Sequence, residues 1–188
     1  MRIIAGRYKS RRIVGNPPAR MRPTSDRLRE TLFNILSDRV IESVFLDGYA
    51  GVGGIGLEAL SRGASQVFFV DQSRKAGELI RSNLEMLQVS TGFRVLKMDL
   101  GVALRGFVAS GAAFDIAFLD PPYAEEAFYA RDLESFGNQT LLTENGLLVL
   151  EHSRKMYLPD EVGKLRQTRN LKQGDSALTF YQFERGIE

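Results

Sequence analysis

The sequence contains no cysteine, no tryptophan and a single histidine, His152, among its 188 residues. Without cysteine the chain can form neither disulfides nor thiolate metal sites, and with one histidine we expect no zinc site. His152 matches no catalytic pattern, and we interpret it as a structural residue. The lack of disulfides gives weak support for the cytoplasm, which is the location that we predict.

Long apolar runs are also absent, since none approaches the roughly 18 residues that a membrane-spanning helix needs. The apolar part of residues 1–7 is too short for a signal peptide. The apolar fraction of 44% and the charged fraction of 26% are typical of a soluble domain. The length suits one domain with a short appendage, and we expect no membrane association.

Acidic residues are scarce at the start of the chain, where basic residues gather. Residues 1–29 hold nine basic side chains and one acidic side chain, Asp26, so this segment carries +8 and the remainder −6 of the net +2. Basic segments bind polyanions by displacing counterions from phosphates. The alternative is a solvated arginine-rich segment that binds nothing, and charge alone does not decide between the two.

The first residues predict a hairpin, a linker and a helix. Residues 2–14 alternate as a short hairpin, and residues 16–23 contain the prolines of a linker. A helix should follow from Thr24 or Ser25, either of which could be its N-cap. Leu28 and Leu32 would face inward, and the side chains expected to face outward are Arg27, Arg29 and Glu30. We divide the chain into a basic appendage, 1–23, and a body, 24–188.

The body alternates between apolar runs and helical stretches. Five runs predict buried strands, at residues 44–46, 67–70, 93–96, 116–119 and 147–150, and the clearest helix covers 73–88. Strands separated by helices imply a parallel sheet that is covered on both faces. Residues 165–170 and 177–183 predict a closing antiparallel hairpin around Gly174. The fold class is therefore α/β and doubly wound, with a mostly parallel sheet that ends in an antiparallel strand.

A glycine-rich loop follows the first body strand and opens a helix. Gly51, Gly53 and Gly56 satisfy the dinucleotide fingerprint Gly-x-Gly-x-x-Gly, and Asp71, after the next strand, could bind a ribose diol. By itself, this fingerprint is also compatible with a nicotinamide cofactor.

Two further carboxylates favour S-adenosylmethionine over a dinucleotide. Asp47 precedes the glycines, where it would repel a pyrophosphate but suits the ammonium group of a methionyl moiety. Asp99 ends the third strand and could accept a hydrogen bond from an adenine amine. Asp71 and Asp99 could instead be helix N-caps. Three carboxylates at successive strand ends, together with the glycines, favour the cofactor site.

The most specific motif is Asp120-Pro121-Pro122-Tyr123, directly after the fourth strand. An exocyclic amine is a poor nucleophile because its lone pair is delocalised into the ring. Acceptors at Asp120 and at the carbonyl of Pro121 would direct that lone pair toward a methyl donor, and Tyr123 would stack on an extruded base. Pro122 stiffens the loop. An ordinary turn is the alternative, but the position after a buried strand favours catalysis.

At this point the sequence resembles the bacterial 16S ribosomal RNA guanine-N2 methyltransferases of the small subunit, a class I, Rossmann-like methyltransferase family. The resemblance covers essentially the whole chain. It is carried by the blocks at residues 2–6, 22–36, 50–53, 56–64 and 120–123. The chain departs from the family at Gly48-Tyr49, where a bulkier apolar residue and an aromatic are usual, and at Asp71, where Glu is common.

The resemblance implies a seven-stranded sheet with an N-terminal β-hairpin, and a methyl transfer that needs no metal. It places the target amine at Asp120 to Tyr123. The cofactor would be held by Asp47, Tyr49, Gly51, Gly53, Gly56, Asp71, Asp99 and Leu100, with Arg22 and Thr24 over its methionine end. The basic appendage would bind RNA through Arg2, Arg7, Lys9, Arg11, Arg12 and Arg20.

The sequence therefore predicts methyl transfer from S-adenosylmethionine to N2 of a guanine in 16S ribosomal RNA. The substrate would be this RNA or a small-subunit assembly particle. Three alternatives stay open: an adenine-N6 methyltransferase acting on DNA, a nicotinamide-dependent oxidoreductase, and a catalytically idle RNA-binding protein.

Overall fold

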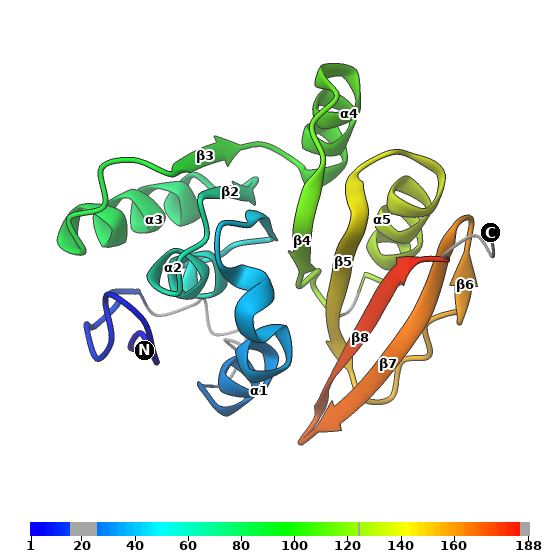
Figure 1. Cartoon of the computed structure of the whole chain (residues 1–188), viewed down its shortest axis with the longest axis horizontal. Coiled ribbons are helices and arrows are strands. Elements are labelled where there is room, and N and C mark those ends of the chain that lie inside the picture. Colours follow the sequence, from blue (N-terminus) through cyan, green and yellow to red (C-terminus); the bar gives the residue numbers. More distant parts are fainter. Residues whose placement is uncertain (16–25, 124, 185–188) are drawn as a thin grey trace.

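The computed structural model describes residues 1–15, 26–123 and 125–184, and Figure 1 shows their arrangement. Within these residues one sheet has the strand order β3-β2-β1-β4-β5-β8-β7-β6. The strands are β1 (Val44–Gly48), β2 (Gln66–Asp71), β3 (Phe93–Lys97), β4 (Phe114–Leu119), β5 (Leu142–Ser153), β6 (Glu161–Val162), β7 (Leu165–Gln173) and β8 (Ser176–Phe183). All five predicted body strands and the closing hairpin are confirmed.

Helices cover both faces of the sheet, as its alternating pattern requires. They are α1 (Asp26–Leu36), α2 (Gly54–Ser61), α3 (Arg74–Met86), α4 (Leu100–Ser110) and α5 (Glu126–Asn138), with the short 3-10 helix η1 (Ser37–Val40) after α1. Helices α1 to α3 share one apolar core with Phe45, Phe69 and Phe118. Helices α4 and α5 share the other core with Leu46 and Leu119, the sequence neighbours of those strand residues. Strands β1, β2 and β4 therefore contribute alternate side chains to the two cores.

The strand pairings bring separate chain segments to one edge. Strands β1 to β5 run parallel to one another, and Gly48 of β1 lies opposite both Val70 of β2 and Leu119 of β4. The loops that follow β1, β2 and β4 therefore emerge side by side, at the carboxyl edge where ligands of such sheets bind.

Two details of the sheet differ from the expected pattern. The sheet has eight strands rather than seven, because the two-residue strand β6 pairs with β7 at its edge. Strand β3 is only partly buried, and its Arg94 is exposed, because β3 forms the opposite edge and has a neighbour on one side only.

The N-terminal residues form a small hairpin that packs onto the body. An antiparallel bridge joins Arg2 and Arg12, and Ile3 and Ile13 are buried in the core of α1 to α3. The prediction that Arg29 faces outward is wrong, because its side chain is fully buried. Its guanidinium donates to Asp26 of the same helix at 3.1 Å and to the carbonyl of Arg2 at 2.6 Å, so the docked hairpin supplies an acceptor that the helical pattern of α1 could not reveal.

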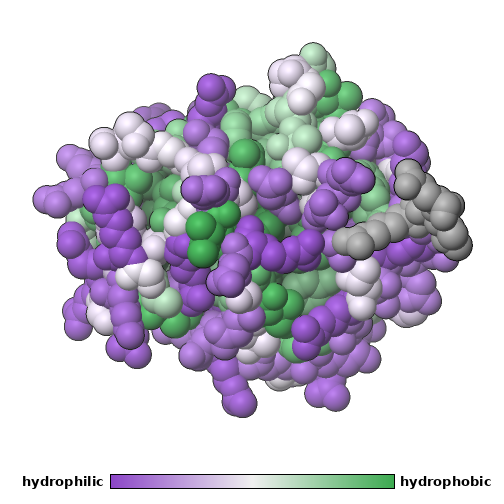
Figure 2. Space-filling model, viewed as in Figure 1, coloured by the Kyte–Doolittle hydropathy of each residue, from purple (hydrophilic) through white to green (hydrophobic). Residues whose placement is uncertain are grey.

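Hydrophilic residues cover most of the face shown in Figure 2, with apolar residues in small groups between them. Among the described residues, no helix is both long enough and apolar enough to span a membrane.

Candidate active site

Asp47 is the last residue but one of β1, before the glycine-rich loop, and is 2% exposed. Its carboxylate accepts a hydrogen bond from the backbone N–H of Gly56, in the first turn of α2, at 2.8 Å. Burial, together with the nearby charge of Asp71, raises the pKa of Asp47 to about 8. A buried carboxylate without a compensating cation is costly, so this position suits a cationic ligand group.

Asp71, the last residue of β2, connects the glycine-rich loop after β1 with the loop that follows β2. Its side chain accepts from the N–H of Gly51 at 2.9 Å and from the N–H of Ser73 at 2.8 Å. The N-cap of α3 is Ser73, whose hydroxyl accepts from Ala76. Asp71 is therefore not the cap, and its contact with Gly51 fixes the glycine loop against the end of β2.

Asp99 has the capping role that the alternative interpretation assigned to it. It is the N-cap of α4 and accepts from the N–H of Val102 at 3.2 Å. It also forms an ion pair with Arg131 of α5, with an N–O distance of 3.2 Å. Its neighbour Leu100 is buried in the core beside α4. A helix cap and a cofactor contact are compatible, because a carboxylate has several acceptor positions.

Tyr49 belongs to a polar network that the sequence did not reveal. It adopts a positive φ of 60°, and its hydroxyl donates to Asp132 at 2.6 Å. Arg131 donates to the Tyr49 hydroxyl at 3.0 Å and also contacts Asp132 and Asp99. Arg131 and Asp132 follow Tyr49 by more than 80 residues and lie in no motif, so only the docking of α5 brings them here.

The glycines of the loop have different roles. Gly51 and Gly53 have positive φ values of 56° and 81°. Apart from its chain neighbours, a Cβ on Gly51 would come within 4 Å of a single atom of the described residues, the carbonyl oxygen of Tyr49 at 4.0 Å. The described residues thus leave space beside Gly51 for a ligand. A Cβ on Gly56 would lie 2.3 Å from the Phe69 ring, so Gly56 permits close packing of α2 on β2.

The contacts of Asp47 argue against the dinucleotide alternative. The N–H groups at the start of a helix are where a pyrophosphate binds in dinucleotide-binding folds. In this chain the side chain of Asp47 already accepts the hydrogen bond of the Gly56 N–H, so this donor is occupied before any pyrophosphate binds.

The Asp-Pro-Pro-Tyr loop leaves β4 beside the end of β1. The N–H of Asp120 donates to the carbonyl of Gly48 at 3.4 Å, which ties this loop to the glycine-rich loop. The carbonyl of Pro121 accepts from the Tyr129 hydroxyl at 3.0 Å, which leaves one lone pair for a further donor. Burial, and next the charges of Glu151 and Asp47, raise the pKa of Asp120 well above its usual range.

Tyr123 lies at the surface of this loop with 36% of its area exposed. Its hydroxyl donates to the Glu151 carboxylate at 3.0 Å and lies 3.0 Å from the Ser176 hydroxyl. Glu151 is itself 2% exposed on β5. It was not predicted as a site residue, because an acid within an apolar strand forms no local motif.

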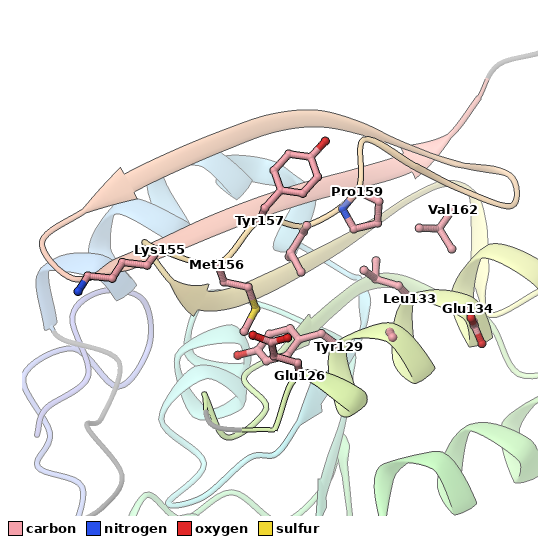
Figure 3. Close-up of a pocket in the computed structure, with 11 residues that line it drawn as sticks. Glu126, Tyr129, Leu133, Glu134, Lys155, Met156, Tyr157, Pro159 and Val162 are labelled. Carbon is pink, nitrogen blue, oxygen red and sulfur yellow. The ribbon is translucent and has the colours of Figure 1, made fainter.

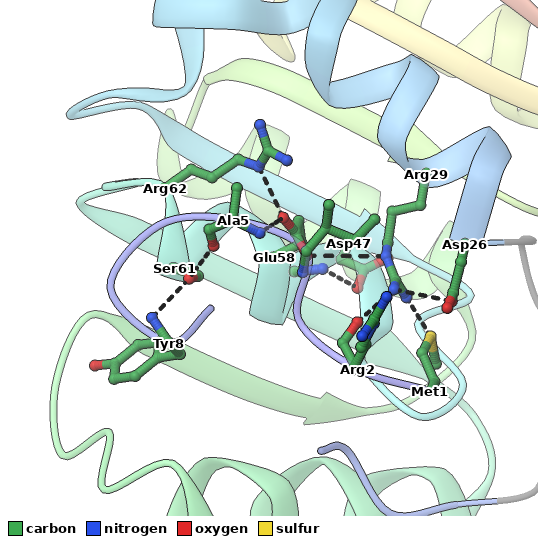
Figure 4. Close-up of polar contacts among 12 residues, drawn as sticks. Met1, Arg2, Ala5, Tyr8, Asp26, Arg29, Asp47, Glu58, Ser61 and Arg62 are labelled. Atoms are coloured by element: carbon green, nitrogen blue, oxygen red, sulfur yellow. Dashed lines mark hydrogen bonds and ion pairs between the residues drawn. The ribbon is translucent and has the colours of Figure 1, made fainter. Parts of the chain in front are cut away.

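The basic hairpin is fixed to the body through a buried acid, as Figure 4 shows. Glu58 of α2 accepts from the N–H groups of Ile4 at 2.8 Å and Ala5 at 3.0 Å, and from Arg62 at 2.8 Å. Asn83 of α3 binds both the N–H and the carbonyl of Val14 and also donates to the carbonyl of Val52. The hairpin is therefore docked beside the glycine-rich loop.

The hairpin displays the predicted RNA-binding side chains on its surface. Those within the described residues are all exposed, namely Arg2, Arg7, Lys9, Arg11 and Arg12. Arg20, and the predicted cofactor residues Arg22 and Thr24, lie outside the described residues.

His152 has a structural environment. It is 1% exposed, and its ring nitrogens lie 2.7 Å from the Thr179 hydroxyl and 2.9 Å from the Ser153 carbonyl. Burial lowers the pKa of His152. In the part of the chain that the structure describes, no cluster of His, Asp and Glu side chains could hold a metal ion.

A cavity of about 480 Å³ lies between α5 and the segment after β5 (Figure 3). Tyr129, Met156 and Pro159 contribute to its lining. None of the predicted cofactor residues within the described part of the chain lines it, and Tyr129 connects its wall to the Pro121 carbonyl.

The parallel sheet with its antiparallel β8, the glycine-rich loop after β1 and the Asp-Pro-Pro-Tyr loop after β4 define the class I methyltransferase fold. Within that class, the model of the family described as conserved hypothetical protein 95 matches residues 1–182. The chain belongs to this family.

Named relatives extend over nearly the whole chain. "Putative rRNA methyltransferase YlbH" of Bacillus subtilis is 36% identical over 182 residues, covering 97% of this chain and 98% of the relative. "Ribosomal RNA small subunit methyltransferase D" of Escherichia coli is 29% identical and covers 98% and 90%. The solved structure of "Putative methyltransferase yhhF from Escherichia coli" superposes with a TM-score of 0.84 at 30% identity, covering 98% of each chain.

Proposed function

We propose that this protein transfers a methyl group from S-adenosylmethionine to the exocyclic N2 amine of a guanine in 16S ribosomal RNA. The observation that carries the proposal is the position of Asp120 and the Pro121 carbonyl beside the end of β1, next to Asp47 and the glycine-rich loop. The relatives named as ribosomal RNA methyltransferases support the class of substrate.

The residues at the carboxyl edge fit the cofactor. The buried carboxylate of Asp47 would pair with the methionyl ammonium group, and Asp71 would accept from the ribose diol. Asp99 and Leu100 would contact the adenine, with Tyr49 and Arg131 holding Asp99 in place. When bound, S-adenosylmethionine supplies an electrophilic methyl carbon whose bond to sulfur breaks as the bond to the amine nitrogen forms.

The chain's own contribution would be alignment. Asp120 and the free lone pair of the Pro121 carbonyl accept the two amine hydrogens, so that the nitrogen lone pair faces the donor. Tyr123 stacks on the base, and its ring is held through its hydroxyl. The amine proton leaves to the Asp120 carboxylate or to water. Positioning of this kind supplies about 7–11 kcal/mol in well-oriented systems.

The division of labour between the two parts of the chain is also proposed. Residues 1–23 would bind RNA phosphates, and residues 24–188 would carry the chemistry. The substrate would be 16S ribosomal RNA or a small-subunit assembly particle in the cytoplasm.

Incubation of the protein with methyl-labelled S-adenosylmethionine and small-subunit RNA, followed by nucleoside mass spectrometry, tests the proposal. We expect labelled N2-methylguanosine. Labelled N6-methyladenosine, or label in DNA only, would contradict the guanine assignment. If no nucleic acid were labelled, the result would favour the alternative of a catalytically idle RNA-binding protein.

A further inference from the structure

A second buried carboxylate lies beside Asp120 at the carboxyl edge of the sheet. Leu119 of β4 is in parallel register with Leu150 of β5, so Asp120 and Glu151 are the next residues of adjacent strands. The Tyr129 hydroxyl lies within hydrogen-bond distance of both the Pro121 carbonyl, at 3.0 Å, and the Glu151 carbonyl, at 3.2 Å. This contact fixes the end of β5 against the catalytic loop.

Glu151 also contacts the residue that would stack on the base. Its side chain is 2% exposed, and its Oε1 accepts from the hydroxyl of Tyr123 at 3.0 Å. Tyr123 itself is 36% exposed. The Glu151 carboxylate therefore lies at the hydroxyl edge of the Tyr123 ring, on the strand beside the one that leads into Asp120.

Guanine and adenine differ at the ring atom beside the amine. In guanine the N2 amine is adjacent to N1–H, a donor, whereas in adenine the N6 amine is adjacent to N1, an acceptor. A carboxylate beside the amine site accepts a hydrogen bond from the N1–H of guanine, but it repels the lone pair on N1 of adenine.

We propose that Glu151 is a specificity-determining residue, whose carboxylate accepts the N1–H of the target guanine while Asp120 and the Pro121 carbonyl accept from N2. This inference rests on the proposed function and extends it to base selection. A matched base contact of this kind changes kcat/KM by about 10- to 100-fold.

The test compares guanine with 2-aminopurine at the methylated position of small-subunit RNA, once the wild-type protein has been used to locate that position. 2-Aminopurine carries the same amine, but its N1 has no hydrogen. We expect the wild type to favour guanine by about 10- to 100-fold in kcat/KM. The amide of Glu151→Gln can donate to N1 of 2-aminopurine, so this variant should lose most of the preference.

Tyr123→Phe is the matched control, because it removes the hydroxyl that contacts Glu151 but keeps the carboxylate. It should keep the preference for guanine even where its overall rate falls. If Glu151 only supported Tyr123, Glu151→Gln and Tyr123→Phe would each slow the methylation of guanine and of 2-aminopurine by the same factor. Both variants would then keep the preference for guanine, and this result would overturn the inference.

Binding of S-adenosylhomocysteine, measured by titration calorimetry, shows whether Glu151→Gln is folded. If it is not, the wild type alone decides, because equal methylation of guanine and 2-aminopurine overturns the inference. A wild type that methylates no guanine overturns the proposed function instead.

Discussion

Ionised Asp47 destabilises the folded protein when no cation lies beside it, because its buried environment favours the neutral carboxylic acid. Its pKa of about 8 in the folded protein compares with 3.8 for an unperturbed aspartate. The folded state therefore holds a proton that the unfolded chain releases above about pH 4. The contribution of Asp47 to stability falls as the pH rises from about 4 to about 8.

Asp47→Asn should accordingly stabilise the ligand-free protein, and increasingly so toward pH 8. One pKa unit corresponds to about 1.4 kcal/mol, so a gain of a few kcal/mol is the upper limit. Thermal unfolding between pH 5 and pH 8.5 measures the difference. Binding of S-adenosylhomocysteine should weaken in the same variant, since the ammonium group loses its counter-ion. A stability difference that does not change with pH would contradict this account of Asp47.

At the scale of single residues, the sequence predicted those site positions that follow directly from a strand end. Asp47 is the last residue but one of β1, Asp71 ends β2 and Asp120 follows β4, and parallel pairing brings such positions together. The contacts of Arg131 and Glu151 with the candidate site residues were not predicted, because they depend on tertiary docking. Asp99 combines its predicted position with the capping role of the alternative interpretation.

At the scale of elements, the hairpin is held by helix side chains, among them Glu58 of α2 and Asn83 of α3. Glu58 is fully buried, and its carboxylate accepts from Ile4, Ala5 and Arg62. Glu58→Gln keeps an acceptor oxygen but removes the charge that faces Arg29 and Arg62. Breaking a buried ion pair in this way costs about 3–5 kcal/mol.

We expect the Glu58→Gln variant to lose stability by that amount and to expose the hairpin first. Hydrogen exchange at the amides of residues 3–13 should accelerate more than exchange at β1. Asp38→Asn, at an exposed acid of η1, is the control and should change neither quantity. Uniform acceleration across the chain would show that Glu58 supports the whole core rather than the hairpin.

The exposed cations of the hairpin predict a salt-dependent contact with RNA. Arg7→Gln combined with Lys9→Gln should reduce the slope of log affinity against log salt by about 0.7–0.9 for each lost phosphate contact. Arg105→Gln combined with Lys164→Gln removes the same charge from exposed positions on α4 and at the β6–β7 turn. If both pairs change the slope equally, binding follows overall charge and not the hairpin.

The secondary-structure elements were predicted better than the contacts between them. The apolar runs predicted the five parallel strands β1 to β5, because strands of a covered parallel sheet give a continuous apolar signal, whereas the two-residue strand β6 was not predicted. The docking of the hairpin was not predictable, since it depends on Glu58 and Asn83 in helices distant from it in sequence. The outward prediction for Arg29 failed for the same reason.

At the scale of the whole molecule, the sheet order places the two halves of the site next to each other. Strand β1, which carries Asp47 and the glycine-rich loop, lies between β2 and β4, and β4 carries Asp120. A cofactor over the first loop and a base over the second would meet at the Asp120–Gly48 contact.

The central claim is that Asp120 directs methyl transfer to a guanine N2 of 16S ribosomal RNA. The most direct test is mass spectrometry of nucleosides from this RNA, isolated from cells that lack the gene and carry either the wild type or Asp120→Ala. Wild-type cells should contain one N2-methylguanosine that gene-deficient cells lack. Asp120→Ala should bind S-adenosylhomocysteine normally but methylate about 10²–10³-fold more slowly in vitro, leaving that guanine largely unmodified. Full methylation by Asp120→Ala at the wild-type rate would contradict the account.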